Sequence, residues 1–294
     1  MKHGFLISSY KNVQNIDELI KYIDTADSFF FIHVDKKSPA FDDPIIQNLR
    51  KKSNVVLLNN RVTVNWGGFS HLEAIISLVK EGLKNKDIAY FHLLSDSCFT
   101  IKPHDAFFNF FNLNNGKEFI EFVKLPASNW AGGGLNRLHY YHMHDLINIK
   151  GKLNRRIEEY FVYLQKVIKI KRNIHAGFES YYGGGTYWSL SRDFLNYAVE
   201  YLTNHPSFYS IFKHSFCAEE IFFHTILLNS SFKSNVVNDN LRYIDWQRRN
   251  GNCPANLDDT DFDAVSKSNK LFARKFIYPL SKNLLERLKM EVLK

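Results

Sequence analysis

The sequence predicts an α/β protein in which one mostly parallel sheet is flanked by helices. Apolar runs of strand length alternate with amphipathic segments through the first hundred residues. The predicted strands are short and rich in Phe, Val, Ile and Leu, and they lie at residues 4–9, 29–35, 54–58 and 90–98. Between them, residues 16–23 and 71–83 place apolar side chains at helical spacing. This alternation is typical of parallel sheets covered by helices on both faces.

Composition predicts a folded globular protein with an anionic partner. Hydrophobic residues make up 45% and charged residues 23% of the 294 positions, which suffices for a full core. The net charge of +8 predicts affinity for nucleic acid, a phosphorylated substrate or an acidic lipid surface, without choosing among them. Cys98, Cys217 and Cys253 are too few for a disulfide framework, and no apolar run suits a signal peptide or a membrane span. We therefore expect a soluble, cytoplasmic protein.

Polar residues stand where the predicted strands end. They are Ser8, Ser9, Asp35, Lys36, Ser95 and Asp96. The carboxyl ends of parallel strands meet at one edge of a sheet, and ligands gather at that edge. These residues are therefore candidates for binding a nucleotide or the group it carries, and the alternative is that they are solvated loop residues.

Two aromatic segments are candidates for a sugar-binding wall. Trp66 lies in the loop at residues 61–70, next to two glycines. Tyr187 and Trp188 follow the triple glycine at residues 183–185. Glycine lets backbone approach a ligand closely, and aromatic faces stack on sugar rings. The alternatives are a tight loop and aromatic side chains buried in the core.

Residues 217–229 are predicted to begin a helix with two carboxylates, Glu219 and Glu220, in its first turn. Three interpretations compete. The acidic pair can simply complement the helix dipole. Glu220 and His224, one turn apart, can ligate a metal, although no third ligand is nearby. Glu220 can also act as a general base held at the mouth of a pocket.

Two segments have the pattern of membrane-surface helices. Residues 150–172 are basic and interleaved with apolar side chains, and the C-terminal residues 281–294 form another amphipathic helix. Such helices can hold a protein at an anionic membrane face, near lipid-linked acceptors. The alternative is that they are solvated faces of ordinary helices.

Sugar transfer from a nucleotide diphosphate sugar would use several of these features together. Inverting transfer needs a carboxylate that takes the proton of the attacking hydroxyl, and positive charge on the departing diphosphate. Metal-using enzymes of this kind carry Asp-x-Asp after a mid-chain strand, but here Cys98 stands in place of the second carboxylate. The pairs Arg248-Arg249 and Arg274-Lys275 offer fixed positive charge instead.

The chain resembles the family of core-2/I-branching β-1,6-N-acetylglucosaminyltransferases and peptide O-xylosyltransferases, with their bacterial and plant relatives. The resemblance runs from about Gly4 to Phe276. It rests on six segments in the family's order, IHVDKK, WGGFS, LLSDSC, YWSLSR, AEEIFFHT and LFARKF, at residues 32–37, 66–70, 93–98, 187–192, 218–225 and 271–276.

This resemblance implies a GT-A-like, Rossmann-like fold and an inverting, metal-independent reaction with a UDP-sugar donor. By position in the family's motif, Glu220 rather than Glu219 is the base. Lys275 matches a diphosphate-binding residue, with Arg274 beside it, and Arg248 or Arg249 is the second cation. We expect one GT-A-like domain over residues 1–280, with the helix at 281–294 packed on or beside it.

The predicted function is transfer of a sugar, with N-acetylglucosamine as the first choice that the resemblance implies, to a hydroxyl of an oligosaccharide or lipid-linked glycan. Neither a metal nor another cofactor is expected, and nucleic acid is not an expected partner. The alternatives are a UDP-xylose-dependent xylosyltransferase and a non-catalytic basic module that binds glycan or nucleic acid. Glycoside hydrolysis would need two facing carboxylates, and the sequence offers one convincing candidate.

Overall fold

The computed structural model describes residues 1–146, 152–174 and 178–293. Within these residues, seven strands form the main sheet in the order β10-β6-β9-β4-β1-β2-β3. The parallel core of the sheet consists of β1 (Lys2–Ser9), β2 (Ser28–Val34), β3 (Val55–Leu57) and β4 (Ile88–Ser95). Next to β4 lies β9 (Trp188–Ser191), which is antiparallel to both β4 and β6 (Glu118–Ile120), and β10 (Val236–Val237) completes the edge.

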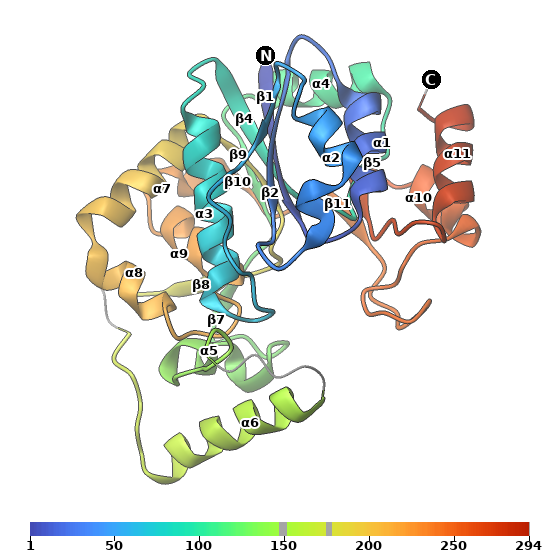
Figure 1. The fold of residues 1–294 in the computed structure, drawn as a ribbon. Coiled ribbons are helices and arrows are strands. Elements are labelled where there is room, and N and C mark those ends of the chain that lie inside the picture. The colour runs from blue at the N-terminus through green and yellow to red at the C-terminus, as the bar shows by residue number, and fades with distance from the viewer. Residues whose placement is uncertain (147–151, 175–177, 294) are drawn as a thin grey trace.

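Helices cover both faces of this sheet because its central strands present apolar side chains on both sides. In β1, Phe5 and Ile7 belong to one buried core and Leu6 to the other. The first core is covered by α1 (Val13–Ile23), α2 (Pro44–Leu49), α4 (His104–Leu113), α10 (Phe262–Ser266) and α11 (Lys282–Glu291). The second is covered by α3 (Phe69–Leu83), α7 (Arg192–Asn204), α8 (Pro206–Phe212) and α9 (Phe222–Leu228) (Figure 1). The predicted α/β class, with a mostly parallel sheet flanked by helices, is confirmed.

Short elements surround this framework. One small sheet joins β11 (Arg242–Ile244), β12 (Phe272–Arg274) and β5 (Phe99–Thr100), and another joins β7 (Val123–Leu125) to β8 (Tyr181–Gly183). The remaining helices are α5 (Asn136–His139) and α6 (Lys152–Val167). The 3-10 turns are η1 (Pro39–Asp42), η2 (Ala131–Gly133), η3 (Ala218–Glu220), η4 (Ser231–Asn235) and η5 (Asp259–Asp261). In Figure 1, α6 lies at the lower end of the molecule, below α5 and away from the main sheet.

The C-terminal helix α11 does not offer its apolar face to a membrane. Leu284, Leu285 and Leu288 are buried in the same core as α1, and Lys289 forms an ion pair with Glu18 on α1. A helix whose apolar stripe is buried in the protein has no such stripe left to insert into lipid. The predicted membrane role of residues 281–294 is therefore wrong.

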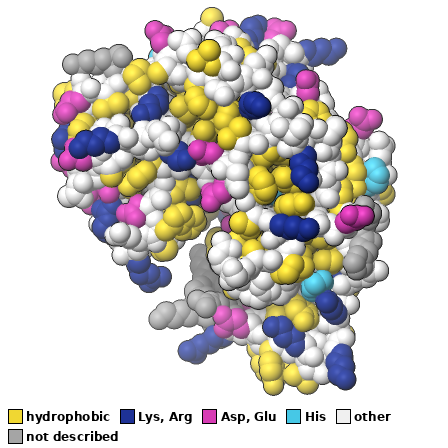
Figure 2. All heavy atoms as spheres, turned by 180° about the vertical axis from the view of Figure 1, so that it is seen from behind, with side chains coloured by type: hydrophobic (Ala, Val, Ile, Leu, Met, Phe, Trp, Pro, Cys, Tyr) yellow, Lys and Arg dark blue, Asp and Glu magenta, His cyan; other side chains and the backbone are white. Residues whose placement is uncertain are grey.

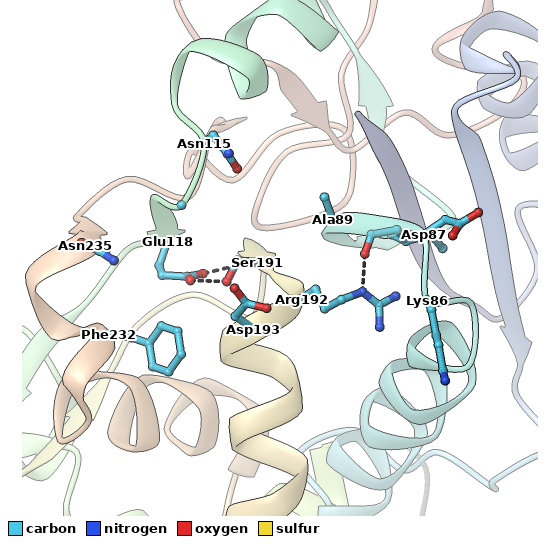
Figure 3. A pocket seen from close by; sticks show the side chains of 12 residues that line it. Lys86, Asp87, Ala89, Asn115, Glu118, Ser191, Arg192, Asp193, Phe232 and Asn235 are labelled. Carbon is cyan, nitrogen blue, oxygen red and sulfur yellow. Dashed lines mark hydrogen bonds between the residues drawn. The ribbon is translucent and has the colours of Figure 1, made fainter.

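Polar contacts at the amino end of β4 serve the fold. Figure 3 shows a hollow in which the buried carboxylate of Glu118 accepts hydrogen bonds from the N–H and hydroxyl of Ser191. The next residue, Arg192, donates from its guanidinium to the carbonyls of Ile88, Leu83 and Asn85. Burial raises the pKa of Glu118 to about 7. These groups tie the start of α7 to β4 and β6, at the edge of the sheet opposite to the predicted donor site.

Candidate functional site

A cavity of about 200 Å³ lies at the carboxyl ends of the parallel strands. Six residues predicted from the sequence line it together, and they are Ser8, Ser9, Asp35, Ser95, Asp96 and Tyr187. His71, at the start of α3, completes the wall on the side of Glu219 and Glu220. The sheet edge therefore brings together the residues selected for following strands, because β1, β2 and β4 run in the same direction.

Asp96 anchors the loop between β1 and α1. Its Oδ2 atom accepts hydrogen bonds from the backbone N–H groups of Tyr10, Lys11 and Asn12 at 2.9, 3.0 and 3.1 Å, and from the Ser9 hydroxyl at 3.3 Å. Ionised carboxylates make strong hydrogen bonds of this kind. Asp96 thus shapes the cavity by holding the loop that forms its rim.

The segment containing Arg274 and Lys275 docks beside this rim. The N–H of Phe276 donates to the Ser97 carbonyl at 2.9 Å, and the Asn12 amide donates to the Phe276 carbonyl at 2.8 Å. The Arg274 guanidinium lies over the ring of Tyr187, 4.4 Å from its centroid. Burial lowers the pKa of Lys275, and the neighbouring Arg274 lowers it further. Arg274 therefore lies beside the cavity through its contact with Tyr187, and Lys275 is close enough to Arg274 to feel its charge.

The two arginines that the sequence left undecided have different environments. Arg249 is engaged with Asp245 at 3.2 Å, with Asp258 at 3.4 Å and with Asp261. Arg248 is exposed and forms no ion pair with any described residue. Arg249 therefore holds its own loop together, and Arg248 is the arginine of this pair that remains available to an incoming anion.

Glu220 lies at the end of η3, and the predicted continuous helix from residue 217 is wrong. The backbone leaves helical geometry at Ile221 before α9 begins. Consequently Glu220 and His224 do not share a helix face, and His224 is fully buried behind the glycine segment. Cys217, Glu219 and Glu220 do bring ligand-type atoms within 4.8 Å of one another. However, both carboxylates already have partners in His71 and Arg137.

The carboxylates of Glu219 and Glu220 differ in exposure and in hydrogen-bond partner. Glu219 is buried, and its Oε1 atom lies 3.1 Å from Nδ1 of His71. The Glu220 side chain is 28% exposed, and its Oε2 accepts a hydrogen bond from Arg137 Nη1 at 2.5 Å. Burial raises the pKa of Glu220, as does the charge of Glu219, whereas Arg137 opposes both effects. Glu220 is thus an accessible carboxylate whose proton affinity is raised by its surroundings.

The sequence analysis missed Arg137 and the residue that orients it. The Arg137 guanidinium lies between two aromatic rings, 4.2 Å from the centroid of Trp130 and 5.2 Å from that of Phe216. This stacking holds the guanidinium toward Glu220. Nothing local in the sequence links Arg137 to a carboxylate 83 positions away.

The aromatic candidates fall into three different places. Tyr187 lines the cavity under Arg274. Trp66 is 78% exposed and packs edge-on against Phe216, so it flanks the Arg137 side of the site. Trp188 is 0% exposed and packs against Phe223 in the core. The hypothesis that Trp188 stacks on a sugar is therefore wrong for this structure, because β9 directs alternate side chains to opposite faces and Trp188 points inward.

A close approach of two backbone segments explains why residue 184, in the triple glycine, has no side chain. Its N–H donates to the Glu220 carbonyl at 2.9 Å, and a Cβ at this position would lie 1.8 Å from the carbonyl oxygen of Glu121. Gly185 has no such restriction, since the nearest atom to a Cβ there would be 3.7 Å away. The segment therefore lets the backbone pass close behind Glu220, which is a packing requirement.

Comparison with known proteins identifies the family. A family model described as "Branch: Core-2/I-Branching enzyme" matches residues 4–267. The chain is 25% identical to Xylosyltransferase oxt of Drosophila pseudoobscura pseudoobscura over 249 residues, 81% of this chain and 25% of that protein. It is 25% identical to Xylosyltransferase 2 of Canis lupus familiaris over 302 residues, 96% of this chain and 32% of that protein. The chain therefore spans about a quarter to a third of these relatives' length.

Among solved structures, mouse Xyloside xylosyltransferase 1 in its apo form overlaps 93% of this chain and 97% of its own, at 11% identity and a TM-score of 0.39. An overlap this loose adds nothing to the argument about the fold.

We expect Gly184→Ala to lower the free energy of unfolding by about 2–3 kcal/mol, because the added methyl group would overlap the Glu121 carbonyl. Gly185→Ala is the matched control, and its change should stay below about 1 kcal/mol. Urea denaturation of both variants measures the difference. Equal stability of the two variants would contradict the close approach described here.

Proposed function

Because the chain belongs to the Core-2/I-Branching enzyme family, we propose that it transfers a sugar from a UDP-sugar to a hydroxyl of a glycan, with inversion at the anomeric carbon. The observation that carries this proposal is that His71, in the cavity wall, interacts electrostatically with the partly exposed carboxylate of Glu220 and with Arg274, which stacks on Tyr187 in the same wall. A base and a cationic edge are the two groups that such a transfer requires.

Glu220 is the proposed general base. Arg137 donates to Oε2 and so fixes the orientation of the carboxylate. The other oxygen, Oε1, has no hydrogen-bond partner among the described residues. The acceptor hydroxyl would give its proton to this carboxylate while its oxygen forms the bond to the anomeric carbon. The bond from that carbon to the diphosphate oxygen would break in the same displacement, and inversion follows from attack opposite the leaving group. Arg137 is a positioning residue in this scheme.

Lys275, Arg274 and Arg248 are the proposed partners of the diphosphate. As the sugar leaves, negative charge grows on the β-phosphate, and fixed cations stabilise it most where water is excluded. Lys275 is partly buried; burial lowers the pKa of its ammonium group, the charge of Arg274 lowers it further, and it forms no ion pair with a residue that the structure describes. A diphosphate would supply a counterion. This scheme needs no divalent metal at the diphosphate.

Two donors fit the proposal. The motif resemblance given under Sequence analysis favours N-acetylglucosamine, whereas the relatives named above are xylosyltransferases, which favours UDP-xylose as a second candidate. The proposed acceptor is an oligosaccharide or a lipid-linked glycan approaching Glu220 past Trp66 and Trp130. Thermal stabilisation by UDP, UDP-xylose and UDP-N-acetylglucosamine, followed by assays of hydrolysis, separates the donors. Retention on DNA without any response to UDP would favour a non-catalytic binding module.

Peripheral contact of a cytoplasmic enzyme with the anionic inner face of a membrane is part of the proposal, and it rests on α6. Apolar side chains recur along this helix at helical spacing and are between 38% and 62% exposed; they are Tyr160, Tyr163, Leu164, Val167 and Ile168. Lys166, Lys169 and Lys171 are exposed nearby. In Figure 2, hydrophobic side chains at the lower end of the molecule are flanked by Lys and Arg. Among the described residues, no helix combines the length and apolarity that crossing a bilayer requires.

We expect Glu220→Gln to lower kcat by about 100-fold or more while UDP binding and fold survive, because an amide cannot take the acceptor's proton. Glu219→Gln should retain activity but shift the pH profile. The base must be ionised, so activity falls as pH drops through the pKa of Glu220, which lies above the ordinary carboxyl value. Removing the charge of Glu219 lowers that pKa, so the acid limb should move to lower pH. Reversed effects of the two substitutions would assign the base to Glu219.

Lys275→Ala should lower kcat/KM by about 100- to 1000-fold, the scale of losing one strong oxyanion partner. Lys267→Ala removes an exposed lysine paired with Asp263 and serves as the matched control, with activity unchanged. Activity of the wild-type protein should persist in excess EDTA. Complete loss in EDTA, restored by manganese, would show that a metal rather than these cations neutralises the diphosphate.

The protein should sediment with phosphatidylserine-containing vesicles at low salt and dissociate at high salt, because both apolar insertion and charge attraction contribute. Replacing Val167 and Ile168 together by serine should abolish sedimentation. Leu113→Ser, which removes an apolar side chain 86% exposed on α4, is the control and should leave it unchanged. A protein that stays in the supernatant at both salt concentrations does not contact membranes through α6.

A further inference from the structure

A cluster of metal-ligand type lies outside the cavity, where the segment after α5 meets α6. It consists of His142, His144 and Glu158, and one ligand atom from each lies within 4.8 Å of the others. Nδ1 of His142 is 3.9 Å from Oε2 of Glu158, and Nδ1 of His144 is 3.9 Å from Oε1. These separations exceed hydrogen-bond distance, so the imidazoles face the carboxylate without bonding to it.

The imidazoles have buried nitrogen atoms that nothing in the described chain satisfies. His144 is only 6% exposed, and its Nδ1, which faces Glu158, has no hydrogen-bond partner; nor has Nε2 of His142. A buried polar atom without a partner costs about 1–3 kcal/mol, so such atoms call for an explanation.

Glu158 is already positioned as a ligand would be. Both of its oxygens accept from the N–H of Met143, at 3.1 and 3.2 Å, which fixes the carboxylate between the two histidines. The backbone N–H of His142 donates to the His214 carbonyl at 2.8 Å, which fixes the main chain that carries this imidazole. Ligands whose orientation is held by further hydrogen bonds are characteristic of metal sites.

We propose that His142, His144 and Glu158 bind one divalent transition-metal ion, with Zn²⁺ as the best match to two imidazoles and a carboxylate. Tetrahedral Zn²⁺ with bonds of about 2.1 Å places its ligand atoms about 3.4 Å apart. The two His–Glu separations are 3.9 Å and all three ligand atoms lie within 4.8 Å of one another, so the side chains would rotate inward to close on the ion. Water would complete the fourth position.

The ion would brace α6 against the Glu220 side of the protein. The His144 ring lies 5.0 Å from that of Phe216, and Phe216 in turn packs against Arg137. His144 also contacts the exposed Trp66 edge-on, at 6.2 Å between ring centroids. None of the three ligands lines the donor cavity. The role of the ion is therefore structural, and the transfer chemistry proposed above does not pass through it.

The test titrates Zn²⁺ into the full chain after EDTA treatment and buffer exchange, with calorimetry and thermal melting as readouts. We expect one ion per chain and a rise in Tm, with Mg²⁺ and Ca²⁺ inactive because they prefer oxygen ligands. His144→Ala and Glu158→Gln should each weaken Zn²⁺ binding by at least about 100-fold and remove the rise in Tm. His104→Ala, which removes a half-buried histidine beside Asp105 and far from the cluster in sequence, is the matched control and should bind normally.

Two further measurements keep the outcome decisive. Each variant is compared with its own metal-free Tm, and if His144→Ala does not fold, Glu158→Gln carries the test, since its amide oxygen can still accept from Met143. Cys217→Ser tests whether Zn²⁺ binds instead at the cluster of Cys217, Glu219 and Glu220. Zn²⁺ binding that is absent, that survives in Glu158→Gln, or that is lost in Cys217→Ser would overturn the proposal. If sugar transfer persists in EDTA, both in the wild type and in Glu158→Gln, then the proposed transfer reaction does not depend on the proposed Zn²⁺ site, and each can be rejected without the other.

Discussion

The carboxylate of Asp96 is the interaction on which the donor side of the site depends. A single oxygen accepts hydrogen bonds from the N–H groups of Tyr10, Lys11 and Asn12, and so connects the loop after β1 to the end of β4. The Asn12 amide then reaches both the Asp96 carbonyl and the Phe276 carbonyl. Through this chain of contacts, the segment bearing Arg274 and Lys275 is placed at the sheet edge although it lies far from β1 in sequence. Loss of the charge at Asp96 would therefore loosen the cavity rim and its cations together.

The acceptor side is built differently. Glu220 is held from below by Gly184, whose N–H bonds its carbonyl, and from the side by Arg137. Cys217, two residues before Glu219, adopts a left-handed backbone with a φ of 50°, which a residue with a side chain rarely does. Local strain of this kind persists where the surrounding packing enforces it. Here it turns the chain so that Glu219 enters the protein and Glu220 faces outward.

The sequence predicted the strand framework well, because buried parallel strands leave apolar runs that can be recognised locally. It also selected residues that line the cavity, since Ser8 and Ser95 stand at the carboxyl ends of β1 and β4 and Asp35 directly follows β2. It failed where the answer depends on distant partners. Whether Arg248 or Arg249 is available is decided by Asp258 and Asp261, and the partner of Glu220 is decided by how Trp130 and Phe216 sandwich Arg137. The inward direction of Trp188 likewise depends on how β9 inserts between β4 and β6.

The attachment of α6 has a consequence for how the two halves of the site can change. This helix is fastened through Gln165, which bonds the backbone of Tyr141, and through Glu158, which bonds that of Met143, while the main sheet is formed without it. Such a unit can change its sequence with little effect on the strands that hold the cavity, because the main sheet is formed without it. The side of the site next to α6 is therefore the part of this chain where substitutions can accumulate without loss of the fold.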